Sequence, residues 1–160
     1  MSKHISNSLE ETQKIADDFV HSLFSLCPTS GKVSGKAVVV GLYGELGAGK
    51  TAFMQCIAKA LGVGEKVLSP TFVIMKIYDI TKIDDISSKL NFDHLIHVDA
   101  YRMDSSDELL HLGWQEIISN PKNLILIEWP ERVTDVMPEH TRVNLRVLSD
   151  ENSREIEILE

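Results

Sequence analysis

Residues 44–51 read GELGAGKT and fill the P-loop pattern G-x-x-x-x-G-K-[ST] at every position. A loop of this kind presents its backbone to a ligand when a strand leads into it and a helix follows. The apolar run 37–43 indicates a buried strand before the loop, and the apolar spacing of residues 51–61 indicates a helix after it. The segment therefore favours a phosphate-binding loop over a glycine-rich turn that merely joins a strand to a helix.

Each position of the loop has a physical role in holding phosphate. Gly44 and Gly49 let the backbone turn tightly and approach phosphate without a Cβ in the way. The N–H groups at the start of the following helix form an anion-binding hollow. Lys50 can reach the β- and γ-phosphates of a nucleoside triphosphate, and the Thr51 hydroxyl can ligate Mg²⁺. The residues predicted to contact the nucleotide here are Glu45, Leu46, Gly47, Ala48, Gly49, Lys50, Thr51 and Ala52.

The rest of the chain predicts alternating helices and strands. Ser8 and Glu11 form a plausible capping box for a helix over residues 9–24. The other expected elements are strands 72–78, 95–99 and 124–127, a helix 106–118, a loop or short helix 79–92, and a hairpin of 142–148 and 154–159. This order predicts an α/β fold in one domain over residues 1–160. It would be a three-layer sandwich like that of P-loop NTPases, with a mainly parallel central sheet and an antiparallel C-terminal hairpin.

The composition restricts the class of partner and the compartment. A chain of 160 residues that is 43% hydrophobic can bury one core. Its formal net charge of −8 argues against gripping nucleic acid directly, although RNA could be approached through a partner protein. Cys27 and Cys56 form no metal-binding or disulfide motif, and Cys56 is expected to be a buried free thiol. The chain shows neither a signal peptide nor an apolar run of membrane-spanning length, which indicates a cytoplasmic protein without a membrane partner.

Two acidic residues follow predicted strands. Asp99 comes after Leu-Ile-His-Val, and Glu128 comes after Leu-Ile-Leu-Ile. Ligands of open α/β sheets bind beyond the carboxyl ends of the strands, so either acid can hold Mg²⁺ through a water or orient the attacking water. Many strands end in an acid that caps a following helix, and the pattern leaves open which of the two acids lies nearer to the metal.

Other polar residues near these strands give weaker signals. The segment 69–71 (SPT) could sense the γ-phosphate through a hydroxyl, although the spacing alone favours an ordinary turn. His97 shares a strand face with Asp99 while His94 points away, so His97 is interpreted as a packed or hydrogen-bonded neighbour rather than a zinc ligand. Residues 81–84 (TKID) resemble the guanine-reading motif T-K-x-D, but they precede both acids and the chain holds no D-x-x-G. ATP is therefore the expected nucleotide.

Several motifs in this order resemble the TsaE family, formerly called YjeE. Besides the P-loop, they are SPTF at 69–72, HVDAYR at 97–102, the E-L and L-G pairs within 108–113, and IEWPE at 127–131. The resemblance runs nearly end to end, and the combination of H-x-D-x-Y-R with E-W-P-E in so short a chain is specific. It implies a compact P-loop α/β domain that binds ATP and Mg²⁺ and hydrolyses ATP slowly alone.

The resemblance also implies a function in tRNA modification. The family is the bacterial ATPase of threonylcarbamoyladenosine (t6A) biosynthesis, so the chain is expected to act with the proteins TsaD and TsaB. That complex transfers threonylcarbamoyl to N6 of adenosine 37 in ANN-decoding tRNAs, and ATP hydrolysis would drive its turnover rather than perform the transfer. A subunit of this kind meets tRNA indirectly, through the complex, which agrees with the negative charge.

The family's catalytic residues carry over by position. Lys50 matches the phosphate-binding lysine and Thr51 the Mg²⁺-ligating threonine, while Asp99 and Glu128 match the acids near the metal. Thr71 lies in a segment that resembles a switch. The resemblance therefore implies that Lys50, Thr71, Asp99 and Glu128 serve catalysis, and that Thr51, Asp99 and Glu128 hold the metal.

Three further residues resemble positions that contact the nucleotide. Thr12 and Arg154 align with such positions near the two chain ends, and Trp129 matches a tryptophan beside the site. From the residues alone, Trp129 could equally close over a ligand or simply pack. The connection 79–93 is longer than the usual one in the family.

Two other functions would use the same loop. A small-molecule P-loop kinase usually carries several arginines in a lid over the transferring phosphate, and no arginine-rich stretch is visible in this chain. In a nucleotide-gated binding module, ATP would only switch the affinity for a partner and hydrolysis would be incidental.

Overall fold

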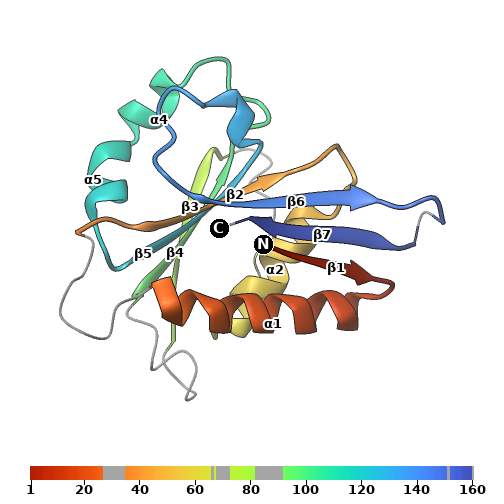
Figure 1. Cartoon of the computed structure of the whole chain (residues 1–160). Helices are drawn as coiled ribbons and strands as arrows, with labels where there is room; N and C mark the ends of the chain where they lie inside the picture. The colour runs from red at the N-terminus through yellow and green to blue at the C-terminus, as the bar shows by residue number, and fades with distance from the viewer. Residues whose placement is uncertain (27–34, 66, 68–72, 82–91, 151, 160) are drawn as a thin grey trace.

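The strand, loop and helix predicted around the P-loop lie together in the structure (Figure 1). The computed structural model describes residues 1–26, 35–65, 67, 73–81, 92–150 and 152–159. Strand β2 spans Val38–Tyr43 and helix α2 spans Lys50–Ala60, each within a residue of the expected bounds. The intervening loop therefore emerges from the carboxyl end of β2, as its phosphate-binding role requires.

The other described elements follow in the order expected for an α/β fold. The first helix begins at the predicted capping box, since Ser8 Oγ accepts a hydrogen bond from the Glu11 N–H at 3.2 Å. The Glu11 carboxylate in turn accepts one from the Asn7 N–H at 2.7 Å. In chain order the elements besides β2 and α2 are β1 (Ser2–Ser6), α1 (Leu9–Leu26), β3 (Met75–Asp79), β4 (His94–Asp99), α4 (Asp107–His111), α5 (Trp114–Ser119), β5 (Asn123–Glu128), the 3₁₀ helix η1 (Pro130–Arg132), β6 (Thr141–Val147) and β7 (Arg154–Leu159).

Within the described ranges, seven strands form one sheet in the order β1-β7-β6-β2-β5-β4-β3. The four central strands β6, β2, β5 and β4 are parallel to one another. At one side β7 pairs antiparallel with β6 and β1 with β7, and at the other side β3 pairs antiparallel with β4. The mainly parallel centre and the C-terminal hairpin are thus confirmed.

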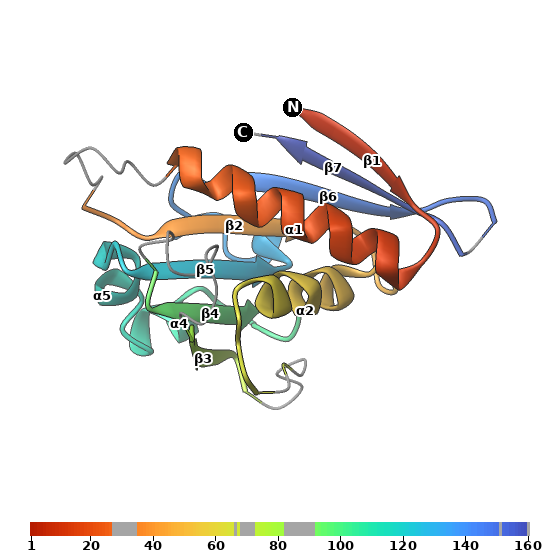
Figure 2. The same ribbon diagram turned by 90° about the horizontal axis from the view of Figure 1, so that it is seen from below.

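Helices cover both faces of the sheet and give three layers (Figures 1 and 2). Helices α1 and α2 pack on one face, where Phe19 and Phe53 join a core with Leu95, Leu124 and Leu126. On the other face, a second core lies beneath α4, α5 and η1; its members are Val39, Ile96, Val98, Ala100, Met103, Leu109, Trp114, Ile125, Ile127 and Val133. No helix in the described part of the chain is both long enough and apolar enough to span a membrane.

Two expected elements differ from the observed ones. The helix expected over 106–118 is broken into α4 and α5 at Gly113, whose φ of 80° is left-handed and ends the first helix. The strand expected at 72–78 is β3, which begins only at Met75 and runs antiparallel at the edge of the sheet. Of the connection 79–92, Asp79 belongs to β3, while residues 82–91 lie outside the described ranges.

The strand β1 was not predicted at all. Its five residues lack a sustained apolar alternation, and only Ser6 is buried. Pairing with β7 stabilises it, helped by an ion pair between the exposed Lys3 Nζ and the half-buried Glu155 at 2.8 Å. Such a strand forms because of its partner, so its own sequence carries little signal.

Candidate functional site

The P-loop makes a tight turn that packs against β6. Gly44 has φ 143°, and a Cβ at this position would overlap the Leu145 carbonyl oxygen. Gly49, which caps α2, has φ 100°. Both conformations are unfavourable for residues with a side chain, so the glycines of the pattern are required by the backbone before any ligand is considered.

Lys50 is buried in this loop rather than extended into solvent. Its Nζ donates to the carbonyl oxygens of Gly44 at 2.6 Å and Glu45 at 2.9 Å, and it lies 3.8 Å from the centre of the Trp129 ring. Burial lowers the pKa of the Lys50 ammonium, while the neighbouring carboxylates, first that of Glu128, act in the opposite direction. A phosphate group would give this cation a stronger partner than two neutral carbonyls.

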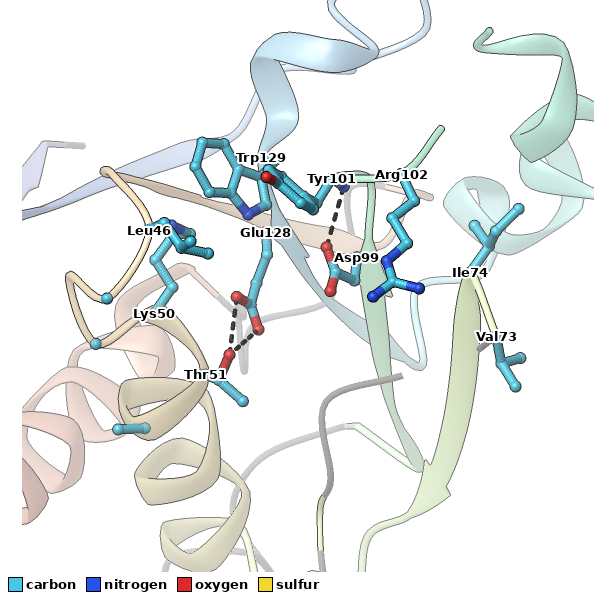
Figure 3. A pocket seen from close by; sticks show the side chains of 13 residues that line it. Leu46, Lys50, Thr51, Val73, Ile74, Asp99, Tyr101, Arg102, Glu128 and Trp129 are labelled. Carbon is cyan, nitrogen blue, oxygen red and sulfur yellow. Dashed lines mark hydrogen bonds between the residues drawn. The ribbon is translucent and has the colours of Figure 1, made fainter. Parts of the chain in front are cut away.

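The Thr51 hydroxyl faces a buried carboxylate across the cleft between α2 and the sheet (Figure 3). Thr51 Oγ1 lies 3.0 Å from each carboxylate oxygen of Glu128, whose exposed fraction is 3%. The Nε2 atom of His97 also lies 3.0 Å from Glu128 Oε1. Hydroxyl and carboxylate oxygens are the ligands that Mg²⁺ prefers, so Thr51 and Glu128 fit a magnesium ion bound together with phosphate.

Strand alternation explains why these groups meet. Successive side chains of a strand point to opposite faces, so His97 and Asp99 share the face of Leu95, and Glu128 shares the face of Leu126. That face is the one covered by α2. Asp99 and Glu128 stand opposite each other in the register of β4 and β5, which places both acids at the carboxyl edge of the sheet.

A cleft of about 640 Å³ lies in front of these residues. Asp99 borders it and accepts a hydrogen bond from the Tyr101 N–H at 3.0 Å. Two apolar side chains that line the cleft are largely exposed, namely Leu46 with an exposed fraction of 76% and Val73 with 60%. The lining residues are Leu46, Gly47, Gly49, Lys50, Thr51, Ala52, Val73, Ile74, Asp99, Tyr101, Arg102, Glu128 and Trp129.

Trp129 is turned toward the loop by an unusual backbone. Its φ of 59° is in the left-handed region, and in the described ranges Trp129 is the only non-glycine residue with that conformation. The turn begins η1 and brings the indole over Lys50 and within 4.9 Å of the Tyr101 ring, measured between centroids. A residue held in a sparsely populated conformation at a cleft is a common mark of a functional site.

A second, smaller cavity of about 190 Å³ adjoins the same loop at Ala48, Gly49 and Ala52. Thr12 and Arg154 both line it. Thr12 Oγ1 lies 2.7 Å from Ser6 Oγ, and a Cβ built on Gly49 would come within 3.8 Å of Arg154 Nε. Residues from both ends of the chain therefore meet beside the P-loop. The other residues that line this cavity are Ser6, Ser8, Leu9, Leu145, Asn152 and Ile156.

Most of the predicted site residues are brought together around the P-loop. Thr71 lies outside the described residues. Glu45 contributes its carbonyl oxygen to Lys50 and does not line either cavity. Sequence reasoning did not single out Tyr101 and Arg102 as site residues, although both belong to the HVDAYR stretch that follows β4.

The metal cluster considered for the histidines is not seen. In the described part of the chain, no group of three histidine, cysteine, aspartate or glutamate side chains could hold a metal ion. His97 is buried and bonded to Glu128, which agrees with its interpretation as a hydrogen-bonded neighbour. Cys56 is a buried free thiol, as expected.

Comparison with known proteins gives one consistent result. The family model described as "Threonylcarbamoyl adenosine biosynthesis protein TsaE" matches residues 6–156. The tRNA threonylcarbamoyladenosine biosynthesis protein TsaE of Treponema pallidum (strain Nichols) is 37% identical over 129 residues, covering 80% of this chain and 86% of the relative. The protein of the same name from Rickettsia prowazekii (strain Madrid E) is 36% identical over 153 residues, covering 94% of this chain and 90% of the relative.

A solved structure has the same arrangement of elements. The crystal structure of Bacillus subtilis YdiB matches with a TM-score of 0.61 and 27% sequence identity. The match covers 97% of this chain and 82% of that one. The fold found here is therefore an established one and extends over almost the whole chain.

Proposed function

The chain belongs to the TsaE family of threonylcarbamoyl adenosine biosynthesis proteins, and from this premise we propose that it is the Mg²⁺-dependent ATPase that supports t6A modification of tRNA. Membership of the family assigns the chain to tRNA threonylcarbamoyladenosine biosynthesis. The proposal that the chain hydrolyses ATP with Mg²⁺ rests on the chemistry of the P-loop site. We also infer that it works in the cytoplasm, because tRNA is the molecule modified.

One observation carries the ATPase proposal. The Thr51 hydroxyl and the Glu128 carboxylate lie 3.0 Å apart at the start of α2, one residue from the phosphate-binding Lys50. A phosphate-binding loop alone could serve many purposes. A P-loop hydroxyl that meets a buried strand-end acid is the arrangement used to bind a triphosphate together with its metal.

Each residue has a defined task in this proposal. Lys50 would exchange the Gly44 and Glu45 carbonyls for oxygens of the β- and γ-phosphates. Thr51 and Glu128 would hold Mg²⁺, which supplies charge neutralisation to the phosphate oxygens when bound. Because Glu128 contacts Thr51 directly, we assign it as the acid nearest to the metal. Asp99 would hold or orient water at the same cleft.

The smaller cavity is a candidate for the other end of the nucleotide. It adjoins the P-loop at Gly49, and Thr12 and Arg154 line it with a hydroxyl and a guanidinium. Its volume of about 190 Å³ is sufficient for part of a nucleoside but not for a whole nucleotide. The phosphates would then lie in the larger cleft and the nucleoside beside β1 and β7.

The partners follow from the family rather than from the site. We propose that the ATPase acts with TsaD and TsaB, and that it meets ANN-decoding tRNA through that complex. The formal net charge of −8 supports an indirect encounter with tRNA, because a protein that binds RNA by itself usually has a basic face. Hydrolysis would drive turnover of the complex between modification events.

The experiment measures ATP hydrolysis by the purified chain, alone and with TsaD, TsaB and an ANN-decoding tRNA. We expect slow hydrolysis alone, stimulation by the complex, and more than one modified tRNA per complex only with ATP present. The Lys50→Ala variant should abolish ATP binding or turnover, and normal turnover in that variant would refute the P-loop assignment. Transfer of phosphate to a small molecule in place of hydrolysis would favour the alternative of a small-molecule kinase.

A further inference from the structure

His97 lies inside the sheet, directly behind the carboxylate that faces Thr51. It is two residues before the end of β4, and its exposed fraction is 0%. In the register of the sheet His97 stands opposite Leu126, so its contact with Glu128 is a diagonal one between neighbouring strands. We infer that His97 is a positioning residue that fixes the Glu128 carboxylate in the orientation needed for Mg²⁺. This inference rests on the proposed metal-binding role of Glu128.

The contact with a carboxylate favours one tautomer of the His97 ring. An ionised carboxylate can only accept hydrogen bonds, so we assign His97 Nε2 as the donor to Glu128 Oε1 across the 3.0 Å that separate them. In the neutral ring, Nδ1 then carries no hydrogen. Nδ1 is buried and has no hydrogen-bond partner in the part of the chain that the structure describes. This tautomer therefore leaves no buried N–H unpaired, and it directs the ring's one donor at Glu128.

The donor constrains the last torsion of the buried Glu128 side chain. The terminal torsion of a glutamate is broad, so one contact at its tip does not set the plane of the carboxylate. Here His97 holds Oε1 from the sheet, while the Thr51 hydroxyl meets both oxygens from α2. Contacts from two directions fix the plane. Partners behind a metal ligand commonly have this orienting effect.

Packing alone does not explain an imidazole at this position. Away from the carboxyl edge, where Asp99 and Glu128 stand, the neighbouring side chains on this face of β4 and β5 are Leu95, Leu124 and Leu126, which all belong to the core under α1 and α2. A fourth apolar residue would suit that environment better than a polar ring, which must find a partner when buried. The partner found is the carboxylate of the site.

Two amide substitutions separate this role from a structural one. In His97→Gln the amide N–H can reach about where Nε2 lies, whereas in His97→Asn the shorter side chain ends near the Nδ1 position and leaves Glu128 without the donor. The readout is ADP affinity by calorimetry on the full chain, once with EDTA and once with Mg²⁺. The Mg²⁺ effect is the ratio of the ADP affinity with Mg²⁺ to the affinity with EDTA. We expect this ratio to fall roughly 10- to 100-fold in His97→Asn and to stay within about fivefold of the parent in His97→Gln.

Controls distinguish loss of positioning from loss of the fold. Both variants should bind ADP in EDTA within about threefold of the parent, because the phosphate contacts of the loop are untouched. Leu126→Val alters the residue opposite His97 without removing a donor and should keep the full Mg²⁺ effect. Equal Mg²⁺ effects in the Asn and Gln variants would overturn the inference. If His97→Asn does not fold, a loss of more than about fivefold in His97→Gln overturns it, and a smaller loss supports it.

The proposed function is tested separately in the same assay. If Lys50→Ala binds ADP normally, the P-loop assignment fails. If Glu128→Gln keeps the full Mg²⁺ effect, the metal role of Glu128 fails, and the positioning role of His97 fails with it. If both of these variants behave as expected and His97→Asn retains the Mg²⁺ effect, only the inference on His97 is refuted.

Discussion

Replacing Glu128 by glutamine would remove one charge from the site and leave its shape almost unchanged. The glutamine oxygen can accept the hydrogen bond of His97, and its amide N–H can donate to Thr51 Oγ1, so the apo contacts of Glu128 have replacements. We therefore expect Glu128→Gln to fold and to bind nucleotide without metal as the parent does. What it loses is an ionised oxygen for Mg²⁺ or its bound water.

The size of the effect follows from that loss. A hydrogen bond to a charged group contributes about 1.5–3 kcal/mol, and the substitution weakens at least one such contact in the metal-bound state. At about 1.4 kcal/mol per factor of ten, this corresponds to a decrease of roughly 10- to 150-fold in hydrolysis at limiting Mg²⁺. The assay is steady-state ATP hydrolysis over a range of Mg²⁺ concentrations, with the melting temperature measured on the same samples. Hydrolysis within about threefold of the parent at every Mg²⁺ concentration would refute the reasoning.

Three further predictions concern other parts of the molecule. Arg154→Ala should weaken nucleotide binding equally with and without Mg²⁺, because Arg154 lines the cavity away from Thr51 and Glu128; a selective loss of the Mg²⁺ effect in calorimetry would contradict this. Gly113→Ala should lower the free energy of unfolding by about 1–2 kcal/mol in urea titration, because φ is 80° there, and no loss would contradict the strain. The pKa of Asp150 is lowered by hydrogen bonds from Ser153, first from its hydroxyl, so the carboxylate stabilises the fold above the ordinary value of 3.8 and this contribution disappears as the pH falls below it. Between neutral pH and about pH 3, the melting temperature of Asp150→Asn should therefore fall by less than that of the parent. An equal fall in both proteins would argue against the contact.

The sequence predicted what depends on local pattern. The P-loop needs glycines where the backbone is left-handed, and strands β4 and β5 are apolar runs that end in acids, so the fold class and most central elements could be read from the sequence. Features that depend on a distant partner were missed or misplaced. Strand β1 forms because β7 is beside it, and β3 takes its direction from β4. The break at Gly113 was also missed, because a single glycine in an apolar helical pattern does not show whether the helix continues.

The same limit applies to the site. Asp99 and Glu128 could be chosen as candidates by their position after strands, but only the register between β4 and β5 shows that they stand opposite each other. The contact of Glu128 with Thr51 depends on where α2 lies over the sheet. His97 could be assigned to a face but not to a partner, because a diagonal contact between strands cannot be read from either strand alone.

The pairing of β1 with β7 has a consequence for how the molecule reaches its native state. Strand β1 near the start of this sequence has β7 near its end as its neighbour, and Ser2 stands opposite Ile158. Figure 2 shows the two strands side by side. Closing so long a stretch of chain is entropically costly and slows folding. The smaller cavity is lined by Ser6 of β1, Thr12 of α1 and Arg154 of β7, so it cannot exist on a nascent chain that still lacks β7. The P-loop is synthesised about a hundred residues before Arg154. During synthesis on a ribosome, a ligand could therefore bind in the smaller cavity only after β7 has paired with β1.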